Sequence, residues 1–261
     1  MSSLFIIGNG FDLDHKLPSS YEDFRKYLLR KYPNAKGMSP SYMISSTILP
    51  NGGEEYDKEE VVSFLLDVIS KAEGYGDWKD IESSLGKLDF EESFSQMSYL
   101  LDDDDDDNDV WKRVDRYESV ARHFYHVTIK IKELFPNWIE SISLTSVNPN
   151  MKFKKLIDKE RDTFLTFNYT RVLEEIYYAE NVFHIHGEQG GEIVLGHGEN
   201  FPEDYENSYW GSEESLLKIH MDLKKDTKSI IASSKSFFDG LCNIDKIYSY
   251  GFSFSKVDLS I

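Results

Sequence analysis

Two glycines flank an asparagine directly after a short apolar segment near the N-terminus. Residues 4–7 are apolar, Gly8-Asn9-Gly10 follows them, and Asp12 comes two positions later. In open α/β sheets, ligands lie beyond the carboxyl ends of the strands, where glycines let backbone N–H groups approach a phosphate. The segment therefore predicts a phosphate-binding loop. The alternative is a tight turn that needs a positive φ at one or both glycines.

An asparagine and a histidine follow later strand-like segments. Asn168 comes after the apolar segment 163–167, and its amide both donates and accepts, which suits a ribose hydroxyl or a water. Capping of the next helix is the alternative role for Asn168. His186 precedes Gly187 at the end of a predicted strand, where an imidazole suits general-base chemistry near neutral pH. His184, deeper in that strand, is predicted to be a partly buried, hydrogen-bonded imidazole.

A metal site is an alternative use of the same region. Ligand types for one or two divalent ions are offered by Asp12, Asp14, His15, His184, His186 and His197. The Asp-x-His sequence that opens many such sites on a strand is missing, because Asp14 and His15 come after the glycine turn. One face of a buried strand also rarely leaves two imidazoles free. We therefore expect no structural metal and no obligatory catalytic one.

The elements that must position these residues alternate between strands and helices. Length and composition predict strands at 4–7, 163–167, 181–186, 192–195 and 244–250, and a helix at 172–179. Such alternation indicates an α/β fold with a mostly parallel sheet. We predict a nucleotide-binding core from residues 1–32 and 160–261, interrupted by a mostly helical insertion at 33–159. The chain ends at Ile261 without a helix to cover its last strand, so we expect a shortened C-terminus or a fragment of a longer protein.

The predicted insertion has three recognisable parts. Residues 33–57 are rich in Pro, Gly, Asn and Ser and predict a loop, whereas 58–141 shows helical periodicity. The six aspartates at 102–107 repel one another and predict a solvated loop. Ser19 or Ser20 is placed to cap a helix before the insertion. Glu82 is expected on a solvated helix face, and closure over the site is its alternative role.

Composition limits the partners and the compartment. The formal charge of −18 has the wrong sign for a protein that neutralises nucleic-acid phosphates, so nucleic acid is not an expected partner. No segment approaches the ~20 apolar residues of a membrane span. The lone cysteine, Cys242, excludes an internal disulfide and a cysteine-built zinc site. A reducing cytoplasm fits these features.

The motifs together resemble the AbiH family of bacteriophage abortive infection proteins. The similar segments run along nearly the whole chain, at residues 7–13, 17–24, 78–82, 164–170, 184–187, 195–198 and 247–258. The resemblance implies a role in bacterial defence against phage. It also implies a nucleotide ligand, and it leaves a second copy of the chain or a phage component open as a protein partner.

AbiH proteins in turn resemble the sirtuin-like NAD-binding domains. That resemblance implies that Gly8, Asn9, Gly10 and Asp12 hold the dinucleotide phosphates, Asn168 and His186 with Gly187 carry the chemistry, and Gly251 with Ser253 contacts the ribose. This sequence departs from the pattern at two positions: Asp12 stands where sirtuins have Ser, and Thr170 stands where the Thr-x-Asn-x-Asp motif ends. The four zinc cysteines of true sirtuins are absent, which argues against a deacetylase.

Three functions remain open at this point. The first is a defence protein that binds NAD, as ligand or substrate, and hydrolyses it with Asn168 orienting the ribose or a water and His186 accepting a proton. The second is a metal-dependent phosphoesterase or nuclease. The third is a non-enzymatic sensor that binds a nucleotide or a phage product and signals by a change of conformation.

Overall fold

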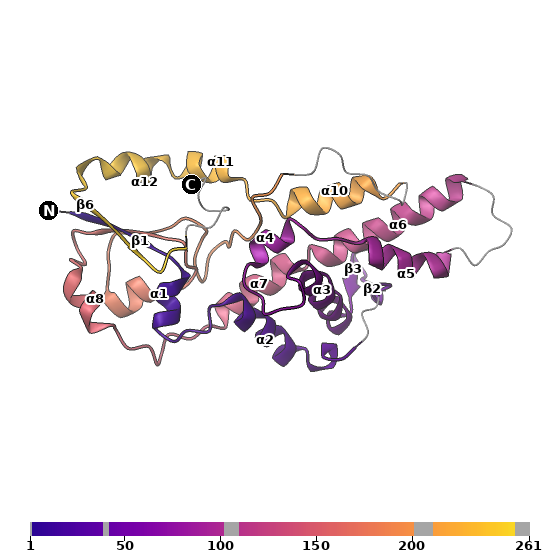
Figure 1. The fold of residues 1–261 in the computed structure, drawn as a ribbon, viewed down its shortest axis with the longest axis horizontal. Helices are drawn as coiled ribbons and strands as arrows, with labels where there is room; N and C mark the ends of the chain where they lie inside the picture. The colour runs from indigo at the N-terminus through magenta and orange to yellow at the C-terminus, as the bar shows by residue number, and fades with distance from the viewer. Residues whose placement is uncertain (1, 39–41, 102–109, 201–210, 254–261) are drawn as a thin grey trace. The chain divides into compact units, whose positions relative to one another are not determined.

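The computed structural model describes residues 2–38, 42–101, 110–200 and 211–253 (Figure 1). The chain divides into two compact units. Unit 1 contains residues 1–24, 135–195 and 225–261, and unit 2 contains residues 25–134 and 196–224. These limits differ from the predicted ranges at three places: residues 135–159 belong with the sheet, and residues 25–32 and 196–224 belong with the helical unit. The aspartate run at 102–107 lies outside the described residues.

Unit 1 is built on a four-stranded parallel sheet. Its strands are β1 (Ser3–Ile7), β4 (Thr163–Thr166), β5 (Val182–His184) and β6 (Lys246–Tyr250), in the order β5-β4-β1-β6. β1 pairs with β4 on one side and with β6 on the other. The predicted α/β class with a mostly parallel sheet is therefore confirmed. The prediction of a strand at 192–195 is wrong, because that segment forms no ladder and only Val194 N–H donates to the His186 carbonyl, at 2.9 Å.

Apolar side chains alternate between the two faces of this sheet, as the two-residue period of a strand requires. Phe5 stacks between Phe164 and Tyr248 on one face, at ring-centroid distances of 5.3 and 4.9 Å. Leu4 and Leu165 belong to the core cluster on the other face. Both faces are apolar because helices cover both.

Helices cover each face of the sheet (Figure 1). α1 (Asn9–Asp14) and α8 (Met151–Leu156) lie on the Phe5 face, whereas α11 (Thr227–Ser233) and α12 (Lys235–Asp239) lie on the Leu4 face. α9 (Val172–Tyr177) connects β4 to β5, α7 (Ile131–Glu140) runs into unit 1, and the 3-10 turn η2 (Gly240–Asn243) precedes β6. Because the four strands are parallel, the loops that follow them lie at one edge of the sheet.

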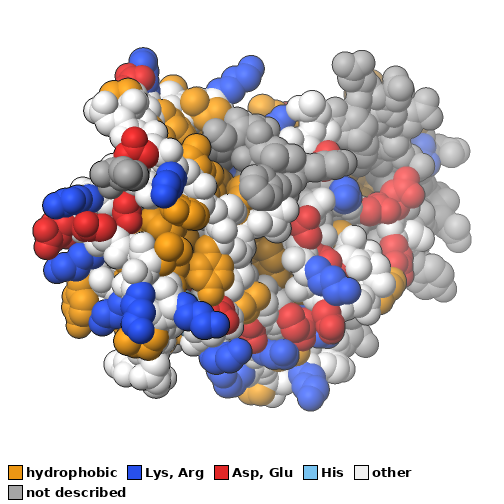
Figure 2. All heavy atoms as spheres, turned by 60° about the vertical axis from the view of Figure 1, so that its left-hand side comes forward, with side chains coloured by type: hydrophobic (Ala, Val, Ile, Leu, Met, Phe, Trp, Pro, Cys, Tyr) orange, Lys and Arg blue, Asp and Glu red, His pale blue; other side chains and the backbone are white. Residues whose placement is uncertain are grey.

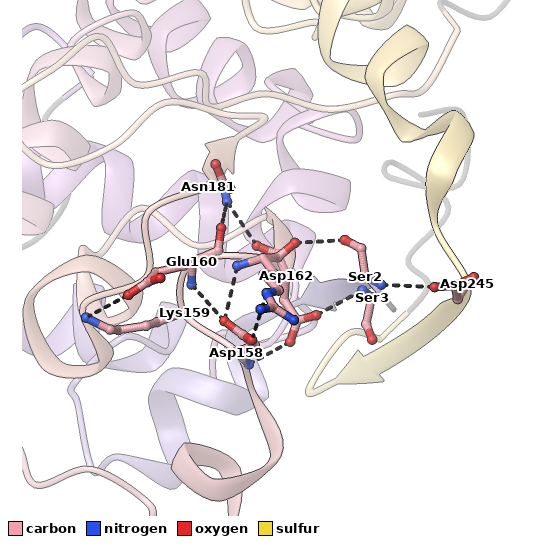
Figure 3. A network of polar contacts seen from close by, with 9 residues as sticks. Ser2, Ser3, Asp158, Lys159, Glu160, Asp162, Asn181 and Asp245 are labelled. Atoms are coloured by element: carbon pink, nitrogen blue, oxygen red, sulfur yellow. Dashed lines mark hydrogen bonds and ion pairs between the residues drawn. The ribbon is translucent and has the colours of Figure 1, made fainter.

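The amino ends of the strands are joined by a separate polar network (Figure 3). Asp162 accepts hydrogen bonds from the backbone N–H of Ser3 and of Asp158, at 2.9 and 2.8 Å. The Ser2 N–H donates to Asp245 at 3.0 Å, and Asn181 donates to the Glu160 carbonyl at 2.9 Å. The network satisfies backbone groups at the sheet edge opposite the glycine loop, so its role is structural.

Unit 2 is mainly helical. It contains most of α2 (Tyr21–Lys31), the 3-10 turn η1 (Pro33–Ala35), β2 (Ser46–Ile48), β3 (Glu54–Tyr56), α3 (Lys58–Ala72), α4 (Ile81–Leu85), α5 (Glu91–Leu101), α6 (Val110–Thr128) and α10 (Glu213–Asp222). Its core includes the stacked rings of Phe64, Phe90 and Phe124. The helical periodicity of 58–141 is confirmed. The prediction of a loop at 33–57 is incomplete, because β2 and β3 form an antiparallel hairpin there.

The predicted helix cap at residues 19–20 is present in the structure, and charges of both signs lie on the surface. Ser20 caps α2, because its hydroxyl accepts from the Asp23 N–H at 3.2 Å while Asp23 accepts from the Ser20 N–H at 3.1 Å. None of the helices in the described part of the chain has the length and apolar character that a membrane span requires. Figure 2 shows Lys and Arg side chains beside Asp and Glu side chains across the face that it draws.

Candidate functional site

The glycine loop follows β1 and packs directly against the loop that follows β6. A Cβ atom on Gly8 would lie 2.5 Å from Phe252 Cα, and one on Gly10 would lie 2.7 Å from Gly251 Cα. Neither Gly8 nor Gly10 has a positive φ, so the alternative that explained both glycines by backbone conformation is wrong. The close approach of a second backbone requires glycine at these positions. The positive φ, of 67°, occurs at Gly251 in the facing loop.

Backbone hydrogen bonds hold the two loops together. Gly8 N–H donates to the Tyr250 carbonyl at 3.0 Å, and Gly10 N–H donates to the Gly251 carbonyl at 2.9 Å. The side chain of Asn9 is held by Ser19 through two hydrogen bonds, of 3.0 and 2.7 Å. Two of the N–H groups predicted to meet a phosphate are therefore already paired within the protein.

A carboxylate, an amide and a hydroxyl meet in the interior below this loop. Asp12 projects from α1, and its exposed fraction is 1%. Its Oδ1 accepts from Asn168 Nδ2 at 2.8 Å, and its Oδ2 accepts from Thr170 Oγ1 at 2.6 Å. Asn168 and Thr170 are also buried. They come from the segment after β4, so the carboxyl ends of β1 and β4 bring these three side chains together.

The electrostatics of this cluster are unusual for an aspartate. Burial raises the pKa of Asp12 to about 6, although the hydrogen bonds from Thr170 and Asn168 act in the opposite direction. Asn168 Oδ1 is buried and accepts no hydrogen bond in the described part of the protein. An unsatisfied buried acceptor is costly, so this oxygen is a place where a ligand hydroxyl or a water would be stabilised. Asn168 does not cap α9, whose N-cap residue is Arg171.

His184 is joined to this cluster through the backbone of Asn168. Its Nδ1 donates to the Asn168 carbonyl at 2.8 Å, and its Nε2 lies 2.8 Å from Glu174 Oε1. Burial lowers the pKa of His184, but the hydrogen bond and charge of Glu174 outweigh burial, and the pKa lies above its usual value. The prediction of a hydrogen-bonded imidazole at position 184 is therefore confirmed.

His186 belongs to a second group of side chains. It is buried, its ring packs edge-on against Phe167 at 5.5 Å, and its Nε2 accepts from Lys225 Nζ at 3.2 Å. Gly187 has a φ of +84°, and a Cβ there would overlap the Glu192 carbonyl oxygen, so the turn after β5 requires glycine. Lys225 is equally buried. Sequence reasoning missed it, because it stands between Lys224 and Asp226 in a segment that looks solvated.

The contacts thus divide the predicted site residues into two groups within unit 1. Asn168 lies with Asp12, and His186 lies with Lys225 and Phe167. Gly8, Gly10 and Gly251 form the joined edge, and Ser253 is exposed just beyond it. Phe167 connects the His186 group to this edge, because its ring also contacts Phe252 at a centroid distance of 4.3 Å.

Other predicted candidates have structural partners. Asp14 accepts from Tyr250 and Asn150, and His15 bonds to the Phe11 carbonyl and to Tyr177. His197 is buried in unit 2, where burial lowers its pKa to about 4 and its ring bonds to the His220 carbonyl. Glu82 is buried in the same unit, so its expected place on a solvated face is wrong.

An open cavity of about 560 Å³ lies elsewhere in unit 1, between the end of α7 and α9. Arg171, Glu175 and Gln189 contribute to its walls. Arg171, one of its lining residues, also lies 3.4 Å from the Glu188 carboxylate.

Comparisons with known proteins agree with the motif pattern. The family model described as bacteriophage abortive infection AbiH matches residues 4–261. A replication protein E1 from human papillomavirus 19 is 28% identical over 140 residues, which are 47% of this chain and 23% of the viral protein. The chain thus spans less than a quarter of that relative, and the identity is too low to show a shared family. No solved structure matches.

Proposed function

Because the chain belongs to the bacteriophage abortive infection AbiH family, we propose that it acts in phage defence by binding NAD or a closely related nucleotide and hydrolysing it. The site is the carboxyl edge of the parallel sheet in unit 1. Loss of NAD would stop the metabolism of an infected cell, which is a chemical route to abortive infection.

The strand order supports a nucleotide site at this edge. β5-β4-β1-β6 is the order of the first four strands of a doubly wound dinucleotide-binding sheet. The chain leaves β1 toward β4 and later returns to pair β6 on the other side of β1. In open α/β sheets, ligands bind where the strand order reverses in this way. That point lies where the Gly8 loop and the Gly251 loop pack together, so a ligand there would lie beside the joined loops.

The departures from the sirtuin-like motifs also support the proposal. Asp12 stands where sirtuins have Ser, and Thr170 stands where they have Asp. In this protein the two side chains bond to each other, at 2.6 Å. The two departures therefore amount to one exchange, in which a carboxylate and a hydroxyl trade places around Asn168. An exchange of this kind keeps the chemistry of the pair.

The observation that carries the proposal is the buried Asp12 carboxyl beside the unsatisfied Asn168 Oδ1. An ionisable or polar group that is buried although its burial destabilises the fold is a candidate for a functional site. Cleavage of the nicotinamide–ribose bond gives the ribose an oxocarbenium-like cation, which a carboxylate in a dry site stabilises. Asn168 Oδ1 would accept from a ribose hydroxyl or from the attacking water.

The atoms of the reaction balance with one water. Nicotinamide leaves with the electron pair of the broken bond, the water oxygen bonds to the ribose carbon, and a proton is released. His186 is the proposed acceptor of that proton. Lys225 donates to its Nε2, at 3.2 Å, so the lysine must withdraw for this nitrogen to take the proton. The products are nicotinamide and ADP-ribose.

The geometry changes what the glycine loop is expected to do. Gly8 and Gly10 use their N–H groups to join the loops after β1 and β6. We therefore propose that these glycines let the two loops pack together, and that other N–H groups donate hydrogen bonds to the pyrophosphate. Ser253 is exposed at the same edge and supplies a hydroxyl for the ribose, as the resemblance implies.

The test is to incubate the purified protein with NAD and measure nicotinamide by chromatography, with and without EDTA. Asp12→Asn and His186→Ala should each lower the rate by ~10²-fold or more. His126→Ala, an exposed histidine of unit 2, is the matched control and should keep the rate. Binding of NAD without nicotinamide release would favour the sensor. Cleavage of a phosphodiester that EDTA abolishes would favour the phosphoesterase.

A further inference from the structure

Three potential metal ligands converge at the carboxyl end of β5. Glu174 comes from α9, His184 is the last residue of β5, and Glu188 lies in the turn that follows. One ligand atom from each lies within 4.8 Å of the other two. His184 Nε2 is 2.8 Å from Glu174 Oε1 and 4.0 Å from Glu188 Oε2. We infer that these three side chains bind a divalent transition-metal ion such as Zn²⁺.

The orientation of the imidazole supports this inference. His184 Nδ1 donates to the Asn168 backbone carbonyl at 2.8 Å, which directs Nε2 toward both carboxylates. A histidine that binds a metal typically donates its other ring N–H to a carbonyl or carboxylate, because this fixes the tautomer and the ring plane. The backbone of Asn168 supplies that support without any further side chain.

An unsatisfied oxygen supplies a second, independent observation. Glu174 Oε2 is buried and accepts no hydrogen bond in the part of the chain that the structure describes. A buried carboxylate oxygen without a partner is costly, and a cation beside it removes that cost. The side chain of Glu188 is 39% exposed, so water and ions reach the cluster from that side.

Charge and ligand type point to the class of ion. Two carboxylates and one imidazole, which loses its Nε2 proton when it binds the ion, offer a net charge of −2. Arg171, 3.4 Å from Glu188, compensates part of this charge. Imidazole favours Zn²⁺ and its neighbours in the transition series, whereas Mg²⁺ and Ca²⁺ prefer oxygen alone. Three ligands leave a fourth position for water. Ligand atoms around a tetrahedral Zn²⁺ lie about 3.3 Å apart, so Glu174 and His184 separate slightly while Glu188 moves in.

The inference is tested by metal binding to the intact, metal-stripped chain, which is independent of NAD cleavage. Titration calorimetry with Zn²⁺, Mg²⁺ and Ca²⁺ in separate runs should show one tight site for Zn²⁺ only. Glu174→Gln and Glu188→Gln should each weaken that site at least about tenfold. Glu175→Gln is the matched control on the same helix: Glu175 pairs with Arg171 at 3.7 Å and contributes no ligand. It should stay within about twofold.

Two controls keep the result interpretable. Circular dichroism must show that each variant is folded, and Glu188→Gln, at an exposed side chain, is the safest of them. Co²⁺ in place of Zn²⁺ should give visible absorption bands that Glu174→Gln changes, which weak binding to the many surface carboxylates would not do. Equal Zn²⁺ affinity in the Glu174, Glu188 and Glu175 variants would overturn the inference. So would Mg²⁺ binding as tight as Zn²⁺ binding, because an oxygen-only surface site would then be responsible.

Discussion

Replacement of Asp12 by Asn should raise the free energy of unfolding relative to that of the unmutated protein. The increase should be larger at neutral pH than at acidic pH. Burial raises the pKa of Asp12 to about 6 from 3.8, a difference of about two pH units. Each unit corresponds to about 1.4 kcal/mol of free energy. The ionised carboxylate therefore costs the folded state about 3 kcal/mol at pH 7. Asn has no charge to bury, and Asn168 can rotate its amide to keep a hydrogen bond to it.

The direction of the pH dependence follows from the raised pKa. Between pH 3.8 and about 6, the folded state holds a proton on Asp12 that the unfolded chain has released. The stability of the unmutated protein thus falls as pH rises through this window and then stays level. The difference in free energy of unfolding, variant minus unmutated protein, should grow by about 2.4 kcal/mol between pH 4 and pH 7. The other titrating groups cancel in this difference.

Urea unfolding at a series of pH values measures this difference. Asp14→Asn is the control on the same helix, because hydrogen bonds from Tyr250 and Asn150 lower the pKa of Asp14. Loss of Asp14 should act in the opposite direction, with a small size at an exposed site. A difference between the Asp12 variant and the unmutated protein that does not change with pH would refute the reasoning, since Asp12 would then titrate as an ordinary surface carboxyl.

Three further substitutions have defined outcomes. Gly187→Ala should destabilise the protein by more than Gly190→Ala in urea unfolding, because both have a φ above +80° but only the Gly187 Cβ meets backbone; equal effects would show that the turn can relax. Asn168→Ala should lower the free energy of unfolding by about 2 kcal/mol at pH 7, since a buried carboxylate loses a charge-assisted hydrogen bond. The loss should be smaller at pH 5, where Asp12 is protonated, and the same unfolding series measures both values. Gly10→Ala should lower the melting temperature in calorimetry, because its Cβ would lie 2.7 Å from Gly251 Cα, and an unchanged value would mean that the two loops separate easily.

The sheet was predictable because its strands are short apolar runs that end at glycine or asparagine. β1 and β4 follow this pattern, and their parallel pairing brings Asp12 and Asn168 to one edge. The segment 192–195 has a similar composition but follows the Gly187 turn, which carries the chain out of the sheet. Composition alone cannot show this, because an apolar segment can be buried with or without a strand ladder.

The electrostatic features of the site were not predictable in the same way. Asp12 stands in the first turn of α1, where an aspartate is usually solvated, and its burial depends on contacts with residues more than 150 positions away. Lys225 looks like a surface lysine in sequence. Asp12 and Lys225 can be assigned to the site only when the fold shows that each is buried beside a site residue.

One residue connects the two proposed sites. The Asn168 side chain donates to Asp12, while its backbone carbonyl accepts from His184, which faces Glu174. A metal ion at Nε2 of His184 would fix that ring, and the ring would in turn fix the backbone of Asn168. Zn²⁺ would then act on nucleotide chemistry without touching the nucleotide. If both proposals hold, Glu188→Gln should lower the rate of NAD cleavage without changing which bond breaks. Asp12→Asn should change Zn²⁺ affinity by much less than Glu188→Gln does, because Asp12 acts on His184 and Glu174 through its charge and not as a ligand. Loss of Zn²⁺ binding on replacement of Asp12 would contradict this separation, since the carboxylate would then belong to the metal site itself.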